Sequence, residues 1–202
     1  MRIAVLASGR GSNLQSLITH WRRGTLKADI VGVGSDNIKA MALEIADQAG
    51  IPTRAFPMES YESKKDQETD ILNWLEELGV ELLVLAGYMR ILSKDFIRRA
   101  EYPIINIHPS LLPSFPGLNA QKQALDYGVK VSGCTVHFVD EGVDSGPIIL
   151  QQAVQVYEED DVKSLSLRIL KVEHQIYPEA VRLIAEGRVK RQGRRVIIFR
   201  DS

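Results

Sequence analysis

The sequence predicts an α/β protein with a Rossmann-like fold, a mostly parallel, twisted sheet flanked by helices with antiparallel strands near the carboxyl terminus. Three observations predict this class. Short apolar runs alternate with segments of helical periodicity in the first half of the chain, as in strand-helix-strand units. A glycine-rich turn directly follows the first apolar run. The chain ends in two strand-like runs around a Gln192-Gly193 turn, which predicts an antiparallel pair.

The first half is expected to alternate strands and helices. Residues 3–7 form a short apolar run, and 81–87 form another that is typical of a central strand covered on both faces. Leu14, Leu17 and Ile18 recur at helical spacing, which predicts a helix over 13–23 that ends at Gly24. The other expected elements are strands at 30–34 and 53–56, a helix at 42–49 closed by Gly50, and a helix carrying Ile71 to Leu78 before Gly79.

The second half is expected to contain strands at 104–107, 131–139 and 148–156, with a short helix around 121–127. Asp160 and Asp161 are N-cap candidates for a following helix, which Pro178 is expected to kink. The final pair, Val189 and 196–199, is expected at the sheet edge. We therefore predict a single domain, residues 1–202, whose halves 1–100 and 101–202 share one sheet.

Composition narrows the function classes. The 202 residues are 45% hydrophobic and 25% charged, ordinary globular values that exclude extensive disorder. The formal net charge of -1 gives no basic bias, so small-molecule ligands are favoured over nucleic acid or an anionic membrane. The single cysteine, Cys134, cannot form an internal disulfide, and neither a secretory segment nor an 18-residue apolar span is found. A cytoplasmic location is expected.

Asn106, His108 and Asp144 are the candidate catalytic residues. Side chains alternate across a strand, so Asn106 and His108 should project from one face, at the carboxyl end where α/β sheets bind ligands. Pro109 should end the strand. Asp144 lies 36 residues further on, and a carboxylate beside an imidazole stabilises the charged ring. Such a set could polarise a carbonyl and move protons; the alternative is a hydrogen-bonded structural histidine.

The segment Ser8 to Leu14 lies between the first strand and its helix, where glycines let backbone N–H groups approach an anion. Leu14 stands where a dinucleotide fingerprint has its third glycine, and the Gly-Lys-Ser/Thr of a P-loop is absent, so the pattern favours a monophosphate over NAD or ATP. The alternative is a plain turn with Ser12 or Asn13 as the helix cap.

Four segments together resemble the folate-dependent phosphoribosylglycinamide formyltransferases of purine synthesis, over nearly the whole chain. They are Ala-Ser-Gly-Arg-Gly-Ser-Asn-Leu at 7–14, Leu-Ala-Gly-Tyr-Met-Arg-Ile-Leu at 85–92, Asn-Ile-His-Pro-Ser-Leu-Leu-Pro at 106–113 and Asp-Ser-Gly-Pro at 144–147. The His-Pro-Ser-Leu-Leu-Pro run is shared by formyltransferases generally and by formyltetrahydrofolate hydrolases, whereas the loop at 8–13 is the narrower signal. The resemblance implies a formyltransferase fold and transfer of the formyl group of 10-formyltetrahydrofolate to the amine of 5-phosphoribosylglycinamide, in IMP biosynthesis, with no metal.

The resemblance also implies residue roles. Asn106 and a protonated His108 would donate hydrogen bonds to the formyl oxygen, and Asp144 would keep His108 charged and hold a water that relays a proton. Residues 1–100 would be the phosphate-binding half and 101–202 the catalytic and folate-binding half. The substrate phosphate would be held by Gly11, Ser12 and Asn13, and its sugar by Glu173; the folate would be bound by Lys64, Met89, Arg90, Ile91, Leu92, Asn106, Asp140 and Asp144.

Two positions depart from the resemblance. Asn119 stands where many relatives carry histidine. Lys64 replaces an arginine common in relatives, which keeps the charge but loses the bidentate fork, so weaker binding of the folate side is expected.

Several alternatives stay open at this point. His20, His137 and His174 lack metal-ligand spacing, so packed or surface histidines are expected. The basic cluster between Arg188 and Arg195 could bind RNA, but charges on an edge hairpin usually block edge pairing. Three competing functions stay open: another folate-dependent formyltransferase, a formyltetrahydrofolate hydrolase, and a non-catalytic folate or nucleotide sensor. A monomer or a homodimer is expected.

Overall fold

The computed structural model describes residues 1–199 and divides the chain into two compact units, the first ending at Ile105 and the second beginning at Asn106. Seven strands form a sheet in the order β3-β2-β1-β4-β5-β6-β7, and β8 and β9 form a separate sheet of two strands. The predicted α/β class, with a mostly parallel sheet and antiparallel carboxyl-terminal strands, is confirmed. The single domain of residues 1–202 stays a prediction.

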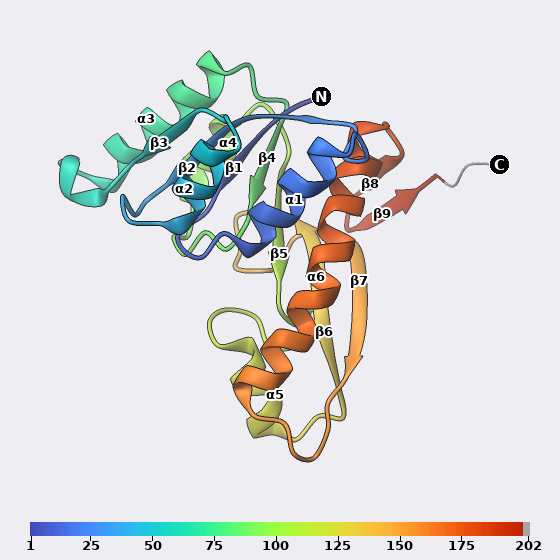
Figure 1. Ribbon diagram of the computed structural model, residues 1–202. Helices are drawn as coiled ribbons and strands as arrows, with labels where there is room; N and C mark the ends of the chain where they lie inside the picture. Colours follow the sequence, from blue (N-terminus) through green and yellow to red (C-terminus); the bar gives the residue numbers. More distant parts are fainter. Residues whose placement is uncertain (200–202) are drawn as a thin grey trace. The chain divides into compact units, whose positions relative to one another are not determined.

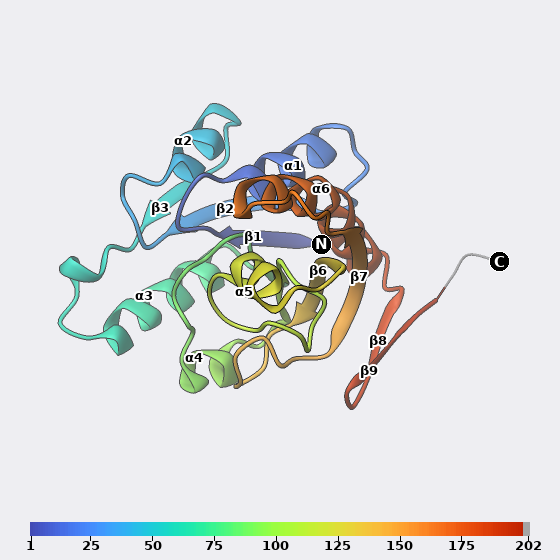
Figure 2. The same ribbon diagram turned by 90° about the horizontal axis from the view of Figure 1, so that it is seen from below.

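The first unit is a parallel sheet covered by helices on both faces. β1 pairs in parallel with β2 and with β4, and β2 pairs in parallel with β3. Figure 2 shows α1 and α2 on one face of these strands and α3 and α4 on the other. Both faces are buried, so residues 3–6 of β1 and all of β4 are apolar. The elements are β1 (Arg2–Leu6), α1 (Ser12–Arg22), β2 (Asp29–Ser35), α2 (Met41–Gln48), β3 (Thr53–Ala55), η1 (Met58–Ser60), α3 (Lys64–Glu77), β4 (Leu82–Leu85) and α4 (Lys94–Arg99).

The second unit is built around an antiparallel strand pair and one long helix. β6 and β7 are antiparallel, and α6 packs along both of them (Figure 1). Leu165 and Ile169 of α6 lie with Cys134 and Val154 in one buried cluster. Asp161 begins α6 through a reciprocal capping box with Ser164, as predicted from the acidic pair. The elements are β5 (Ile104–His108), which begins just before this unit, α5 (Ala120–Tyr127), β6 (Val131–Phe138), β7 (Ile148–Gln155), α6 (Val162–Ala185), β8 (Val189–Gln192) and β9 (Arg195–Ile198).

Two features differ from the sequence prediction. The helix α4 was not predicted, because six residues are too few for a periodic signal; Ser93 caps it by accepting a hydrogen bond from Phe96 N–H. The hairpin β8–β9 is expected at the sheet edge, and β9 does contact the edge strand β7, but within residues 1–199 the two strands form ladder hydrogen bonds only with each other. Lys190 and Arg191 of β8 are exposed, and cationic strands resist pairing with a sheet edge.

Within residues 1–199, no helix is long and apolar enough to cross a membrane.

Candidate active site

The strand β5 ends at His108, and its other residues are three isoleucines and Asn106. The imidazole is buried, with 5% of the residue exposed. Asn106 lies two positions earlier, and its Nδ2 atom is 3.4 Å from Nε2 of His137 on β6. Both β5 side chains therefore reach the same small group of polar residues in the second unit.

Asp144 joins this group from the loop between β6 and β7. Its Oδ2 atom lies 3.2 Å from Nδ1 of His108 and accepts a hydrogen bond of 2.8 Å from Gly117 N–H. Asp144 has φ of 49°, in the left-handed region that only a few non-glycine residues adopt. The chain thus spans the 35 residues between His108 and Asp144 and brings the two side chains into contact.

Both ring nitrogens of His108 face oxygen atoms. Nδ1 faces the Asp144 carboxylate, and Nε2 lies 2.8 Å from the carbonyl oxygen of Phe115. A neutral imidazole has only one N–H, whereas the protonated ring can donate to both oxygens. When the ring carries a proton on Nε2, that N–H is donated to the backbone carbonyl of Phe115.

The sequence predicts His137 to be a packed or surface histidine, and the structure places it beside Asp144. Its Nε2 atom lies 3.6 Å from Asp144 Oδ1, and its Nδ1–H donates to the carbonyl of Phe138 at 2.9 Å. The neutral ring can then accept an N–H of Asn106, and the protonated ring can direct its second proton to Asp144. The sequence contained one signal for this role of His137. It is the only histidine in the stretch 131–138, whose other residues are apolar or small, and a buried histidine needs a polar partner.

The pKa of Asp144 is lowered from its ordinary value. Burial alone would raise this pKa, but the interaction with His137, the hydrogen bond from Gly117 N–H and the charge of His108 outweigh it. The carboxylate consequently stays ionised under mildly acidic conditions.

Asp140 organises the loop that carries Asp144. Its Oδ1 atom accepts hydrogen bonds from Gly142 N–H at 3.1 Å and from Ser145 Oγ–H at 2.6 Å. On the other side of the loop, Arg194 of the β8–β9 turn donates to the carbonyl of Ser145 at 3.0 Å. Asp140 is therefore engaged within its own loop, and the basic hairpin reaches the residue next to Asp144.

In the first unit, the loop 8–14 leads into the amino terminus of α1. Gly11 is the N-cap, with φ of 71°, and no side chain of the described residues caps the helix by a hydrogen bond. The alternative of Ser12 or Asn13 as the cap is therefore wrong. A Cβ atom at Gly11 would lie 2.9 Å from Cα of Ala42, so this position requires glycine for both conformation and space. The uncapped backbone N–H groups at this helix end suit an anion.

The segment Met89–Leu92 is joined to the loop 8–14. Met89 N–H donates to Ser8 Oγ at 2.8 Å, and Ser8 N–H donates to the carbonyl of Gly87 at 3.1 Å. The side chains of Met89 and Ile91 are 65% and 66% exposed, so they present an apolar surface that suits a flat aromatic ligand. Arg90 pairs with Asp36 at 3.0 Å, which leaves its backbone rather than its side chain for ligand contact.

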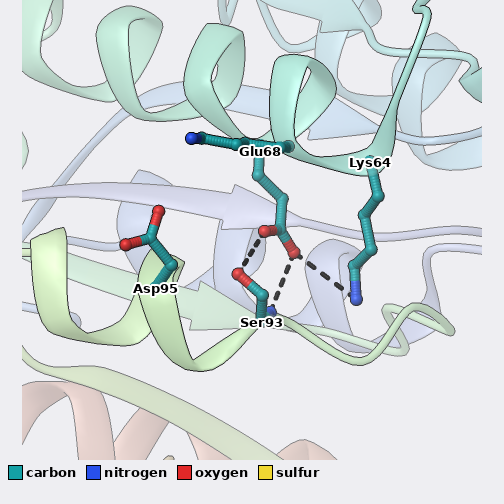
Figure 3. A pocket seen from close by; sticks show the side chains of 5 residues that line it. Lys64, Glu68, Ser93 and Asp95 are labelled. Carbon is teal, nitrogen blue, oxygen red and sulfur yellow. Dashed lines mark hydrogen bonds and ion pairs between the residues drawn. The ribbon is translucent and has the colours of Figure 1, made fainter.

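Lys64 lies at the start of α3, beside this segment. Its Nζ atom donates to the carbonyl of Ile91 at 2.6 Å and lies 3.6 Å from Oε1 of Glu68. Figure 3 shows these side chains at a cavity of about 350 Å³ that Lys65, Ser93 and Asp95 also line. The ammonium group that the resemblance assigns to the folate is thus already bound to protein atoms.

Glu173 lies on α6 with only 7% of the residue exposed. Burial raises the pKa of the nearby Cys134 thiol to about 12, and the negative charge of Glu173 adds to the shift. Cys134 is therefore a neutral packed residue and not a nucleophile.

Asn119 has φ of 58° at the start of α5, a conformation that asparagine tolerates better than most side chains.

Within residues 1–199, no three His, Cys, Asp or Glu side chains are grouped so that they could hold a metal ion.

The fold and this site define a class of protein. Residues 1–181 match the model of the formyl transferase family, and the chain belongs to that family. The predicted formyltransferase is thereby confirmed at the level of the class.

The most informative relatives carry more specific names. The chain is 43% identical over 181 residues to phosphoribosylglycinamide formyltransferase of Bacillus subtilis, covering 90% of this chain and 93% of the relative. It is 50% identical over 189 residues to the trifunctional purine biosynthetic protein adenosine-3 of Bos taurus, and the match spans 94% of this chain but only 19% of that protein. Glycinamide ribonucleotide transformylase 1 of Symbiobacterium toebii superposes with a TM-score of 0.96 at 50% identity, covering 99% of this chain and 94% of that one.

Proposed function

We propose that this protein transfers the formyl group of 10-formyltetrahydrofolate to the amine of 5-phosphoribosylglycinamide, giving the N-formyl product and tetrahydrofolate in purine (IMP) biosynthesis. One observation carries the chemistry: Nδ1 of His108 contacts Asp144, and His137 beside them contacts both Asp144 and Asn106. The names of the relatives support the acceptor, as does the uncapped helix end at Gly11.

The reaction needs stabilisation of one developing charge. The substrate amine attacks the formyl carbon, a C–N bond forms, and the carbonyl oxygen becomes negative. Asn106 and His108 donate N–H groups to that oxygen, and a single donor of this kind is typically worth about 3 kcal/mol of barrier. The bond from the formyl carbon to the folate nitrogen then breaks. Asp144 keeps His108 charged and holds the water through which the amine proton reaches the leaving nitrogen.

The Nε2–H of His108 must be released before it can act in this way, since it donates to the Phe115 carbonyl. Phe115 has φ of 54°, in the left-handed region, so its backbone is held in an uncommon conformation. We infer that occupation of the site displaces this carbonyl and turns the Nε2–H toward the formyl oxygen.

Each substrate is assigned the residues that the resemblance implies. Gly11, Ser12 and Asn13 hold the phosphate, and Glu173 binds the sugar hydroxyls. Met89–Leu92 contact the pterin, and Asp140 shapes the loop that completes the folate site. Lys64 acts on the folate side through its bond to Ile91. The partners are small molecules, and a monomer or homodimer stays a prediction.

Formyl transfer from 10-formyltetrahydrofolate to three acceptors tests the proposal. The acceptors are 5-phosphoribosylglycinamide, an amino-sugar nucleotide and water. We expect kcat/KM for the ribonucleotide to exceed the other rates by at least about 100-fold, as expected for a site built to bind a charged phosphate. Tight binding of both ligands without transfer would instead identify a sensor and overturn the enzyme assignment.

A further inference from the structure

Glu68 is a buried carboxylate of α3 for which the reaction above has no role. Only 6% of the residue is exposed, and both of its oxygens are engaged by one neighbour. Ser93 N–H donates to Oε1 at 2.8 Å, and the Ser93 hydroxyl donates to Oε2. Figure 3 shows the carboxylate pointing from α3 directly at Ser93.

A charge buried in this way needs compensation, because desolvation would otherwise expel or neutralise it. Lys64, one helical turn earlier on α3, brings its ammonium group to 3.6 Å from Oε1. The same ammonium donates to the carbonyl of Ile91 at 2.6 Å. Two residues of one helix face therefore hold two backbone positions of the segment that leads into α4.

Packing holds only one end of that segment in place. Leu92 is buried, but Met89 and Ile91 are more than half exposed, and the cavity of about 350 Å³ lies beside the Lys64–Glu68–Ser93 contacts. The exposed part of the segment therefore depends on hydrogen bonds for its conformation. Ser93 is the anchor, because its hydroxyl also accepts from Phe96 N–H at 3.0 Å and so begins α4.

We propose that Glu68 is a positioning residue for the folate site, which fixes the backbone of Met89–Leu92 by binding Ser93 and by holding Lys64 against Ile91. The assignment of Met89–Leu92 to the folate rests on the proposed function. The contacts by which Glu68 holds the segment do not depend on that function, so the positioning role and the folate assignment can be tested separately.

Glu68→Met tests the proposal, since methionine has a similar shape but no acceptor oxygen and no charge. Glu68→Gln is the conservative variant that keeps one acceptor. Glu77→Met is the matched control, because it changes an exposed glutamate of the same helix. Amide hydrogen exchange at Ser93 reports the holding of the segment, and steady-state kinetics with each substrate varied in turn report its consequence.

We expect Glu68→Met to increase the exchange rate of the Ser93 amide about tenfold. We also expect it to raise KM for 10-formyltetrahydrofolate about tenfold. Both changes are of the size expected from losing a hydrogen bond to a charged group. Glu68→Gln should lie between this variant and the wild type. KM for 5-phosphoribosylglycinamide and kcat should stay within about twofold, and Glu77→Met should match the wild type.

Unchanged exchange at Ser93 in folded Glu68→Met would overturn the proposal, as would an equal loss in both KM values and kcat. If Glu68→Met does not fold, the same measurements on Glu68→Gln decide. A wild-type protein without formyl transfer would refute the proposed function, and the exchange result would still judge the role of Glu68.

Discussion

Nδ1 of His108 lies 3.2 Å from Oδ2 of Asp144, although 35 residues separate them in the chain. The contact is fixed from both sides. Gly117 N–H binds the carboxylate, and the Phe115 carbonyl binds the far side of the imidazole. The imidazole is therefore fixed in orientation from both sides, and the proposed donation from Nε2 to the formyl oxygen requires the contact with the Phe115 carbonyl to break first.

Asp144→Asn should lower kcat by about 100-fold to 1,000-fold, the range for loss of one preorganised charge-stabilising group. Steady-state kinetics with each substrate varied in turn, which give kcat and both KM values, check this. A rise in KM with kcat unchanged would assign Asp144 to binding instead.

His137→Phe should raise the pKa of Asp144, since the interaction with His137 is among those that lower it. A carboxylate whose folded pKa is lowered stabilises the protein above the unfolded pKa, and this contribution disappears as pH falls through the folded pKa. The stability advantage of pH 6 over pH 3 should therefore be smaller in the variant than in the wild type. Carbon NMR titration of the Asp144 carboxyl group and unfolding by urea at both pH values measure it. An unchanged Asp144 titration would show that His137 only packs.

Gly11→Ala should raise KM for 5-phosphoribosylglycinamide by at least about tenfold, because the methyl group meets Ala42 and the residue must keep a positive φ. Gly9→Ala is the control in the same loop, where a Cβ has no atom of the described residues within 4 Å. Initial rates at varied ribonucleotide concentration distinguish the two. Equal effects of both substitutions would argue against a built phosphate site at Gly11.

Arg194→Ala should lower kcat by about threefold to tenfold, the scale of one partly exposed hydrogen bond, because Arg194 holds the carbonyl of Ser145 next to Asp144. Arg195→Ala removes an equal charge from the same hairpin and is the control. Comparing kcat of the two variants at low and high salt separates this contact from a general charge effect. Matching losses in both variants would remove Arg194 from the site.

Much of the fold was predictable because its signals are local. The runs at 3–7 and 81–87 and the helical spacing of Leu14, Leu17 and Ile18 follow from burial on one or two faces. The role of Asp161 as the N-cap of α6 could also be predicted from the local sequence. The six-residue helix α4 was not, since its one signal is the Ser93 cap, and the separation of the β8–β9 hairpin from the large sheet depends on tertiary contacts.

The candidate site divides in the same way. By itself, the sequence determined which residue types stand at strand ends and in the glycine loop, and so identified Asn106, His108, Asp144 and Gly11 as candidates. Only the tertiary structure decided what each of them touches. It showed that His137 contacts Asp144, that the Phe115 carbonyl contacts His108, and that Lys64 donates a hydrogen bond to the carbonyl of Ile91. Side-chain periodicity is a property of neighbours in the chain, whereas a hydrogen bond between residues 27 or 36 positions apart exists only after loops have closed.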